Sequence, residues 1–193
     1  MNNYGINIWS DDNFVIEDGL AKINHDCKPS LISIVKDIRK QDFKGPLLLR
    51  FPHITEKQIN TLYNTFNASI KEYDYKGNFN AVFPLKVNQL PNFIHPLINE
   101  GKKFNYGLEA GSKAELVIAM TYNNINSPIT VNGFKDKEMI HLGFIAKSMG
   151  HDITLIIEGL NELEMIIEVL NETKMEAPSI GLRVRLHSGG SGL

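Results

Sequence analysis

From residue 81 onward, short apolar runs alternate along the chain with longer segments of helical period. Apolar runs of this length predict buried strands, and segments with a 3.6-residue period predict helices. Capping signals support two of the helices: Ser112 and Glu115 form an S-x-x-E capping box, and Asp136 is an N-cap before a helix that stops at Gly150. We therefore expect strands over 81–87, 104–108, 129–131, 153–157 and 180–186, with helices over about 92–99, from 112, over 136–150 and over about 161–173.

The first part of the chain has a different rhythm. Short strand-like runs are separated by turn residues, and a helix with Ser30 as its N-cap follows them. A longer helix opens at Thr55, which makes a T-x-x-Q capping box with Gln58. This region predicts strands over 4–9, 14–16, 20–23 and 47–51, and helices over 31–40 and from 55 to about 73. We divide the chain into an N-terminal strand and helix region, 1–52, and a barrel region, 53–193.

Strands that alternate with helices indicate a parallel sheet, which is either open and doubly wound or closed as a (β/α)8 barrel. A doubly wound sheet normally carries a glycine-rich turn after its first strand. Here that strand ends in Leu85-Lys-Val-Asn88, which favours the barrel. The chain supplies about five of the eight strands. The predicted fold class is therefore α/β, an incomplete TIM-type barrel after a short β-containing region, and we expect an N-terminal fragment of a longer protein. The alternative is a complete protein with a glycine-rich tail.

Composition excludes several functional classes. Lys and Arg number 20 against 22 Asp and Glu, the net charge is -2, and no basic run occurs, so nucleic acid is not an expected partner. The apolar runs are too short to cross a membrane. The single cysteine, Cys27, forms no internal disulfide, and the N-terminus lacks a secretion signal, which fits a cytoplasmic protein.

Polar residues end each of the predicted barrel strands: Lys86, Glu109, Asn132, Glu158, and Arg185 with His187. In a barrel the carboxyl ends of the strands meet at one mouth, where active sites lie. The alternative is that strand ends are solvated and polar in any case. We interpret the five positions as a candidate active site.

Lys86 and Glu109 offer the most specific chemistry. A lysine at the inner rim of a barrel can form a Schiff base, as pyridoxal 5'-phosphate (PLP) requires, and the PLP ring then acts as an electron sink. A carboxylate at Glu109 would favour the protonated form of that nitrogen. The alternatives are a solvated surface lysine and a charge that stabilises the N-terminus of the following helix.

The remaining positions are more ambiguous. Arg183 and Arg185 share one side of their strand; Arg185 is expected to point inward, and Arg183 to face solvent or helices. Asn132 and Glu158 fit a turn as well as a site. His187 with two nearby serines lacks the acid of a hydrolytic triad, and the other histidines lack metal-ligand spacing.

Several stretches, in this order, resemble the biosynthetic arginine decarboxylases of bacteria and plants. Those stretches are Tyr4-Gly-Ile-Asn-Ile-Trp9, Pro46-Leu-Leu-Leu-Arg-Phe-Pro52, Phe83-Pro-Leu-Lys-Val-Asn-Gln89, Asn105-Tyr-Gly-Leu-Glu-Ala-Gly-Ser-Lys113, Asn132-Gly-Phe-Lys-Asp136, Gly159-Leu-Asn-Glu-Leu-Glu164 and Gly181-Leu-Arg-Val-Arg-Leu186. The resemblance implies an alanine-racemase-like fold, decarboxylation of L-arginine to agmatine and CO2 in polyamine and spermidine biosynthesis, magnesium, and a dimer or higher homo-oligomer.

The resemblance also implies roles for individual residues. The Schiff-base lysine falls on Lys86 and the family's acidic residue on Glu109, which we take as catalytic. Asn132 and Arg185 are the further cofactor-binding candidates. The histidine that stacks on PLP belongs to a His-x-Gly-Ser motif one strand later, so His187 is not that residue. The phosphate-binding glycine loop also lies beyond Leu193, and we expect residues 1–193 alone to be inactive. The alternatives are a diaminopimelate or ornithine decarboxylase and a non-catalytic PLP-binding or regulatory module.

Overall fold

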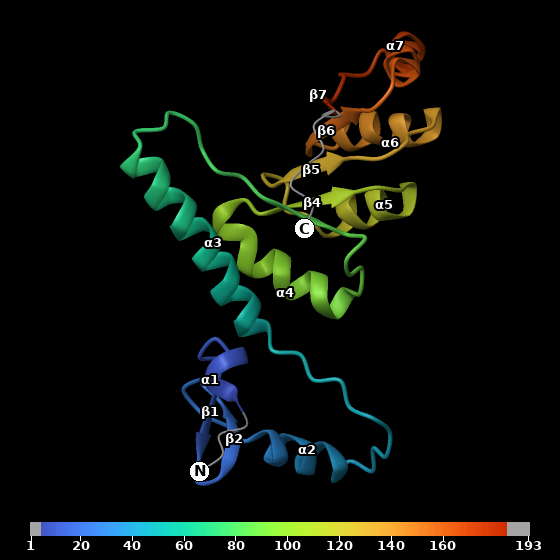
Figure 1. The fold of residues 1–193 in the computed structure, drawn as a ribbon. Helices are drawn as coiled ribbons and strands as arrows, with labels where there is room; N and C mark the ends of the chain where they lie inside the picture. Colours follow the sequence, from blue (N-terminus) through green and yellow to red (C-terminus); the bar gives the residue numbers. More distant parts are fainter. Residues whose placement is uncertain (1–4, 185–193) are drawn as a thin grey trace. The chain divides into compact units, whose positions relative to one another are not determined.

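The structure, a computed structural model, describes residues 5–184. The chain divides into two compact units, residues 1–54 and 55–193, which are taken separately below. Figure 1 shows the order of the elements along the chain.

The first unit is built on a β-hairpin. Strands β1 (Phe14–Glu17) and β2 (Leu20–Ile23) pair antiparallel, and Asp18 and Gly19 connect them, both with positive φ, as a tight two-residue hairpin turn requires. Helix α2 (Leu31–Arg39) follows, and the side chain of its N-cap Ser30 accepts a hydrogen bond from the Ser33 amide. These predicted elements are confirmed.

Two predicted strands in this unit are wrong. Residues 6–9 of the expected strand over 4–9 form a short helix, α1 (Ile6–Trp9), because Gly5 adopts φ 67° and turns the chain into it; residue 4 lies outside the described part. The expected buried strand over 47–51 has no regular structure, and Leu48 within it is 75% exposed. An apolar run alone did not specify a pairing partner there.

The helix predicted from 55 to about 73 is found as α3 (Pro52–Glu72); its end is confirmed, and its start is wrong. It begins three residues before Thr55, so the expected capping box at Thr55 and Gln58 lies inside the helix and is wrong. Proline suits the first turn of a helix, where its missing N–H has no intrahelical acceptor. The buried ring of Tyr63 on α3 stacks on Phe104, with ring centroids 4.4 Å apart.

The second unit carries five parallel strands in sequential order, β3-β4-β5-β6-β7. Sequential order is the topology of a barrel wall, whereas a doubly wound sheet reverses its order at a switch point. The sheet stays open, so the predicted incomplete barrel is confirmed. Its strands are β3 (Val82–Pro84), β4 (Gly107–Ala110), β5 (Pro128–Val131), β6 (Asp152–Ile157) and β7 (Ser179–Leu182), with helices α4 (Pro91–Gly101), α5 (Lys113–Tyr122), α6 (Lys137–Ser148) and α7 (Leu160–Thr173) between them.

The strand predicted over 180–186 ends at Leu182 within the described residues. Two other strands are shorter or later than expected. The strand predicted over 81–87 ends at Pro84, and a turn follows. The strand predicted over 104–108 begins only at Gly107, because a 3-10 turn (Lys102–Phe104) ends at Asn105 with φ 54°. Both shifts leave the predicted site residues at or beyond the carboxyl ends of their strands.

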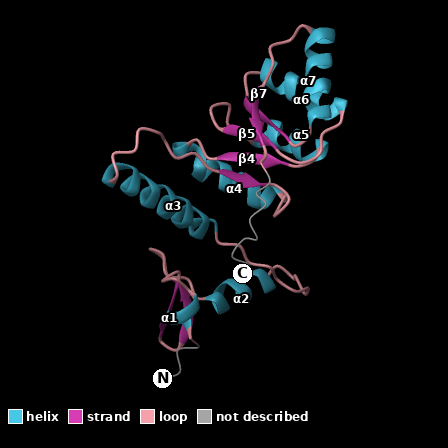
Figure 2. Ribbon diagram, turned by 45° about the horizontal axis from the view of Figure 1, so that its top comes forward, coloured by secondary structure: helices cyan, strands magenta, loops and turns pink. Residues whose placement is uncertain are grey.

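The two faces of the sheet differ in burial. Figure 2 shows α5, α6 and α7 along one face, and side chains on that face are fully buried, among them Leu108, Ile129 and Leu155. The alternate residues, which include Glu109, Thr130 and Thr154, point to the other face and are partly exposed. The helix-free face is the one that lines the interior of a closed barrel.

The amino ends of the strands hold a buried histidine. His151 directly precedes β6 and is 5% exposed, and burial lowers the pKa of its imidazole below the usual value of 6.5. Ser127, fully buried, directly precedes β5 at the neighbouring position, since Pro128 pairs with Asp152. His151 therefore folds in its neutral form at neutral pH.

This burial predicts acid sensitivity. Below pH 6.5 the unfolded chain binds a proton at His151 that the folded chain does not, so this contribution to stability is complete above that pH and falls as the pH is lowered. The slope should reach at most about 1.4 kcal/mol per pH unit. Urea unfolding of the His151→Gln variant between pH 7.5 and 5.5 should show a flatter profile than the parent chain. His141→Gln, at an exposed histidine on α6, should keep the parent slope; equal slopes in all three proteins would refute the prediction.

Candidate active site

The predicted site residues within the described range lie at one edge of the sheet, because all five strands run parallel. Lys86 lies in the turn after β3, which the Val87 amide closes by donating to the Pro84 carbonyl at 3.0 Å. The preceding residue, Leu85, donates its amide to the carbonyl of Glu109 at 3.0 Å. The backbone thus brings Lys86 next to the end of β4, where Glu109 stands.

Glu109 lies on the helix-free face of β4, opposite the buried Leu108 and Ala110. The alternative role, a charge that stabilises the start of the next helix, belongs to another residue. Glu115 accepts the Gly111 amide at 2.7 Å at the N-terminus of α5. Glu109 is therefore separate from the cap of α5 and available at the carboxyl edge.

The cap of α5 also joins two loops. Ser112 is the N-cap and accepts the Glu115 amide at 3.2 Å, as the sequence predicts. The buried Glu115 carboxylate takes the Gly111 amide on one oxygen and the side-chain amide of Gln89 on the other, the latter at 2.9 Å. This carboxylate ties the loop after β3, which carries Lys86, to the loop after β4.

A second glutamate at the same helical position makes a stronger tie. Glu162 lies three residues after Gly159, the N-cap of α7, and accepts the Lys135 and Glu158 amides, each at 2.9 Å. Its carboxylate also lies 3.0 Å from the Lys135 ammonium, and the two side chains are 3% and 0% exposed. Burial alone would raise the pKa of Glu162, but these hydrogen bonds and the ammonium charge lower it below its usual range.

Glu158 connects the loop after β5 with β7. One of its carboxylate oxygens accepts the Gly133 amide at 2.8 Å and an Arg183 guanidinium N–H at 3.1 Å. The same Gly133 amide lies 3.1 Å from the side-chain oxygen of Asn132. Gly133 has φ 103°, a conformation that favours glycine, so the Asn132–Gly133 turn is specified by sequence. Asn132 is a turn residue and also stands at the candidate site.

The expected orientation of Arg183 is confirmed in part. Its side chain is 49% exposed, as a solvent-facing arginine should be, but its guanidinium also pairs with Glu158, on the same side of the sheet as Glu109. The reason is register: Gly181 pairs with Ile156, so Arg183 lies beside Glu158 two positions further on. Arg185 and His187 lie outside the described residues.

Sequence reasoning missed the buried pair of Lys135 and Glu162. Charged residues near a helix start usually face solvent, and Gly159 lacks the hydroxyl that makes a capping box visible in a sequence. The spacing of three residues from helix start to glutamate, shared with Glu115, is the signal that identifies this role.

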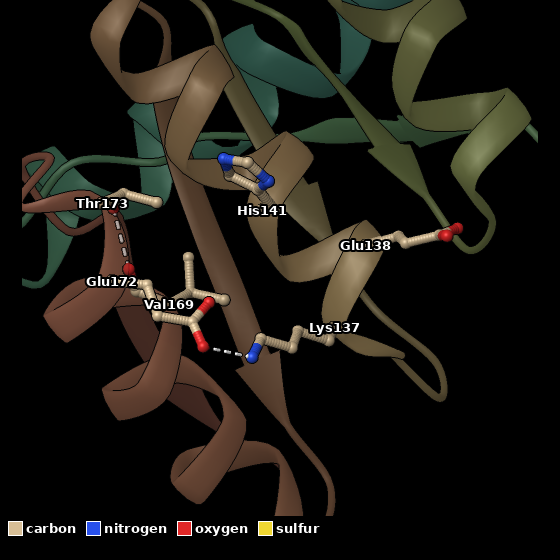
Figure 3. Close-up of a pocket in the computed structure, with 6 residues that line it drawn as sticks. All are labelled: Lys137, Glu138, His141, Val169, Glu172 and Thr173. Carbon is tan, nitrogen blue, oxygen red and sulfur yellow. Dashed lines mark hydrogen bonds and ion pairs between the residues drawn. The ribbon is translucent and has the colours of Figure 1, made fainter.

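The hollow drawn in Figure 3 is lined by none of the predicted site residues. This hollow lies between α6 and α7, on the helical side of the sheet, and has a volume of about 250 Å³. Lys137 occupies it as an ion pair with Glu172 at 2.7 Å and Glu168 at 3.3 Å, and these carboxylates raise the pKa of Lys137. Within residues 5–184 no group of three metal-ligating side chains occurs, and no described helix is long and apolar enough to span a membrane.

Comparison with known proteins gives a consistent result, although no family model matches the chain. Biosynthetic arginine decarboxylases of Prochlorococcus marinus (strain AS9601) and Bacteroides thetaiotaomicron are each 36% identical to it. These matches cover 100% and 98% of this chain, and 30% and 31% of the relatives. The chain thus spans about a third of the length of the curated relatives it matches.

Solved structures agree in fold. The biosynthetic arginine decarboxylase of Campylobacter jejuni is 60% identical, with a TM-score of 0.94 over 97% of this chain and 32% of that one. A diaminopimelate decarboxylase from M. jannaschi, 24% identical, shares the fold with a TM-score of 0.67 over 93% of this chain and 37% of that one. Over nearly its whole length, the chain is thus similar in sequence and in fold to the biosynthetic arginine decarboxylases.

Proposed function

We propose that this chain supplies one wall of a PLP site in a protein that decarboxylates L-arginine to agmatine and CO2, as a step of polyamine and spermidine biosynthesis. The similarity to biosynthetic arginine decarboxylases supports the reaction. The observation that carries the proposal is the position of Lys86 beside the end of β4, where Glu109 faces the helix-free side. Asn132 and Arg185 complete the proposed cofactor-binding set. We add Arg183, because its guanidinium pairs with Glu158 at the same edge of the sheet.

The donor set fits PLP. Among residues 5–184, neither Lys86 nor Glu109 makes a side-chain hydrogen bond or ion pair with another described residue, whereas the neighbouring Glu115, Glu158 and Glu162 are all engaged. Lys86 thus offers an exposed amine for covalent attachment. Arg183 offers a half-exposed guanidinium for an anionic group, since its side chain is 49% exposed.

In this proposal the residues of this chain hold the cofactor and orient it. PLP, when bound, supplies the electron sink that stabilises the carbanion left by loss of CO2. Lys86 would fix the cofactor at the carboxyl edge through its Nζ atom. The negative charge of the Glu109 carboxylate would favour a proton on that Nζ atom. The glutamate ties at Glu115 and Glu162 keep the loops in place, which is the preorganisation that a site on loops requires.

The test uses the longest protein that carries this chain. Incubation with PLP and carboxyl-labelled L-arginine should release labelled CO2 and equimolar agmatine, well above the rate with free PLP. Ornithine and diaminopimelate should react far more slowly. Preference for either of these would support the related decarboxylases, and PLP binding without CO2 release would support a non-catalytic PLP-binding module.

Three further points belong to the same proposal because the family resemblance suggests them: a dimer or higher homo-oligomer, a magnesium requirement and a cytoplasmic location. Sedimentation of the protein, and activity measured with EDTA and with added magnesium, would test the first two.

Glu109 provides a prediction about charge. Glu109→Gln keeps the shape and removes the negative charge, so a protonated nitrogen beside it is disfavoured. PLP should still be retained through Lys86, while the pH-dependent change in its visible absorbance moves to lower pH by about 1–3 units and kcat falls. Glu164→Gln, at an exposed position on α7, is the matched control. An unchanged absorbance titration and kcat, with only a lower melting temperature, would remove Glu109 from the site.

A further inference from the structure

Glu158 stands where three segments of the carboxyl edge meet. It directly follows β6, and its side chain is only 9% exposed. The carboxylate accepts the Gly133 amide from the loop after β5 and an N–H of Arg183 from the residues after β7. A single oxygen therefore connects the two neighbours of β6, one on each side.

The position of Glu158 is itself fixed. Its amide donates to Glu162 at 2.9 Å, and Glu162 is held by the buried Lys135 ammonium. A carboxylate on a backbone anchored in this way has little freedom to reorient. Its two partners must adapt to it, which is the arrangement expected of a group that positions others.

Both partners of Glu158 lead to residues that face the proposed site. The Gly133 amide is shared with the side-chain oxygen of Asn132, at 2.8 Å to Glu158 and 3.1 Å to Asn132. Arg183 uses one N–H for Glu158, and its half-exposed guanidinium keeps further donors for an anion. Glu158 thus sets both the Asn132–Gly133 turn and the direction of the guanidinium.

We infer that Glu158 is a positioning residue of the decarboxylase site, one that holds Arg183 and the Asn132–Gly133 turn in the geometry that binds the anionic part of cofactor or substrate. This inference rests on the proposed function. Glu158 does not itself contact the reacting atoms, and its effect passes through Arg183. The pairing is charge-assisted, and such hydrogen bonds are about twice as strong as neutral ones.

The substitution Glu158→Gln isolates the charge. The glutamine oxygen can still accept the Gly133 amide, but it no longer pairs with a cation, so Arg183 loses its fixed direction. We expect the dissociation constant for PLP to rise about tenfold. Arg183→Met should have a similar effect. In the Arg183→Met background, Glu158→Gln should add less than about a twofold change, because the two residues act as one unit.

The experiment combines a cofactor titration with a readout that does not depend on activity. PLP affinity is measured by absorbance for the parent protein, both single variants, the double variant and the control Glu164→Gln. Nitrogen-15 NMR of the arginine side chains, without PLP, compares the hydrogen-exchange rate of the Arg183 guanidinium. Glu158→Gln should accelerate that exchange at least about fivefold, whereas Glu164→Gln should leave it unchanged. Arg183→Met, at a half-exposed side chain, keeps the test valid if Glu158→Gln does not fold.

The outcomes separate the two proposals. Additive effects in the double variant, or unchanged Arg183 exchange in Glu158→Gln, with normal PLP binding by the parent protein, overturn this inference and leave the proposed function standing. Absence of PLP binding by the parent protein overturns the proposed function and this inference with it. Non-additive affinities with faster Arg183 exchange support both.

Discussion

Lys86→Ala should abolish covalent retention of PLP and lower arginine decarboxylation by on the order of 10³-fold, because the other lysines described at this edge, Lys113 and Lys135, are held in ion pairs. After borohydride reduction and proteolysis, the PLP label in the parent protein should map to the peptide that contains Lys86. Lys86→Arg keeps the positive charge but should lose the label equally. Lys102→Ala, at another exposed lysine, is the matched control and should retain full labelling.

The same substitution should leave the fold intact. The Lys86 side chain is exposed and makes no hydrogen bond or ion pair with another described residue. Its replacement should therefore change the free energy of unfolding by less than about 0.5 kcal/mol. A label that maps to a different lysine, or activity retained by Lys86→Ala, would remove Lys86 from its proposed role.

The largest expected effect on stability belongs to Glu162. Glu162→Ala leaves the Lys135 ammonium buried without its carboxylate and removes the acceptor of two backbone amides. Breaking a buried pair from one side costs about 3–5 kcal/mol. Lys135→Met should cost less, because Glu162 then keeps both amide donors. Urea unfolding gives the free energy of unfolding of the parent protein, of Glu162→Ala and of Lys135→Met.

Glu164→Ala on the same helix is the control and should fall within about 0.5 kcal/mol of the parent, since that side chain is exposed. A loss for Glu162→Ala no larger than that of Glu164→Ala would show that the pair contributes little. A loss for Lys135→Met larger than that for Glu162→Ala would show that the ammonium, not the carboxylate, is the anchor.

Much of the fold could be predicted from the sequence because its signals are local. The caps at Ser30, Ser112 and Asp136 act within one turn of their helices, and all three are found as predicted. The failures involve longer range. The apolar run at 47–51 looked like a strand, but a strand needs a partner, and no local pattern specifies one. The shift of a strand to Gly107–Ala110 depends on the left-handed backbone of Asn105.

The common edge at which the candidate site residues lie was predictable from the sequence, but the contacts of those residues were not. Polar residues at strand ends pointed to one edge, and parallel pairing puts them there. Which charges pair is a question of register between strands, and alternation along one strand cannot answer it. The sequence therefore indicated that Arg183 is exposed but not that it pairs with Glu158, which follows from the alignment of β6 with β7. The burial of Lys135 required the same three-dimensional information.

The two edges of the five-stranded sheet differ in their capacity to pair with a further strand. At one edge, β3 is only three residues long and includes Pro84, which has no amide hydrogen to offer a further strand. At the other edge of the described sheet, β7 carries Ile180, 46% exposed, and Leu182, 76% exposed, and Val184 just after the strand is also 76% exposed. Such an edge is a template for strand addition. A protein limited to residues 5–184 should therefore associate through β7 in concentrated solution, and a soluble peptide that adds one strand there should reduce this association, as measured by sedimentation.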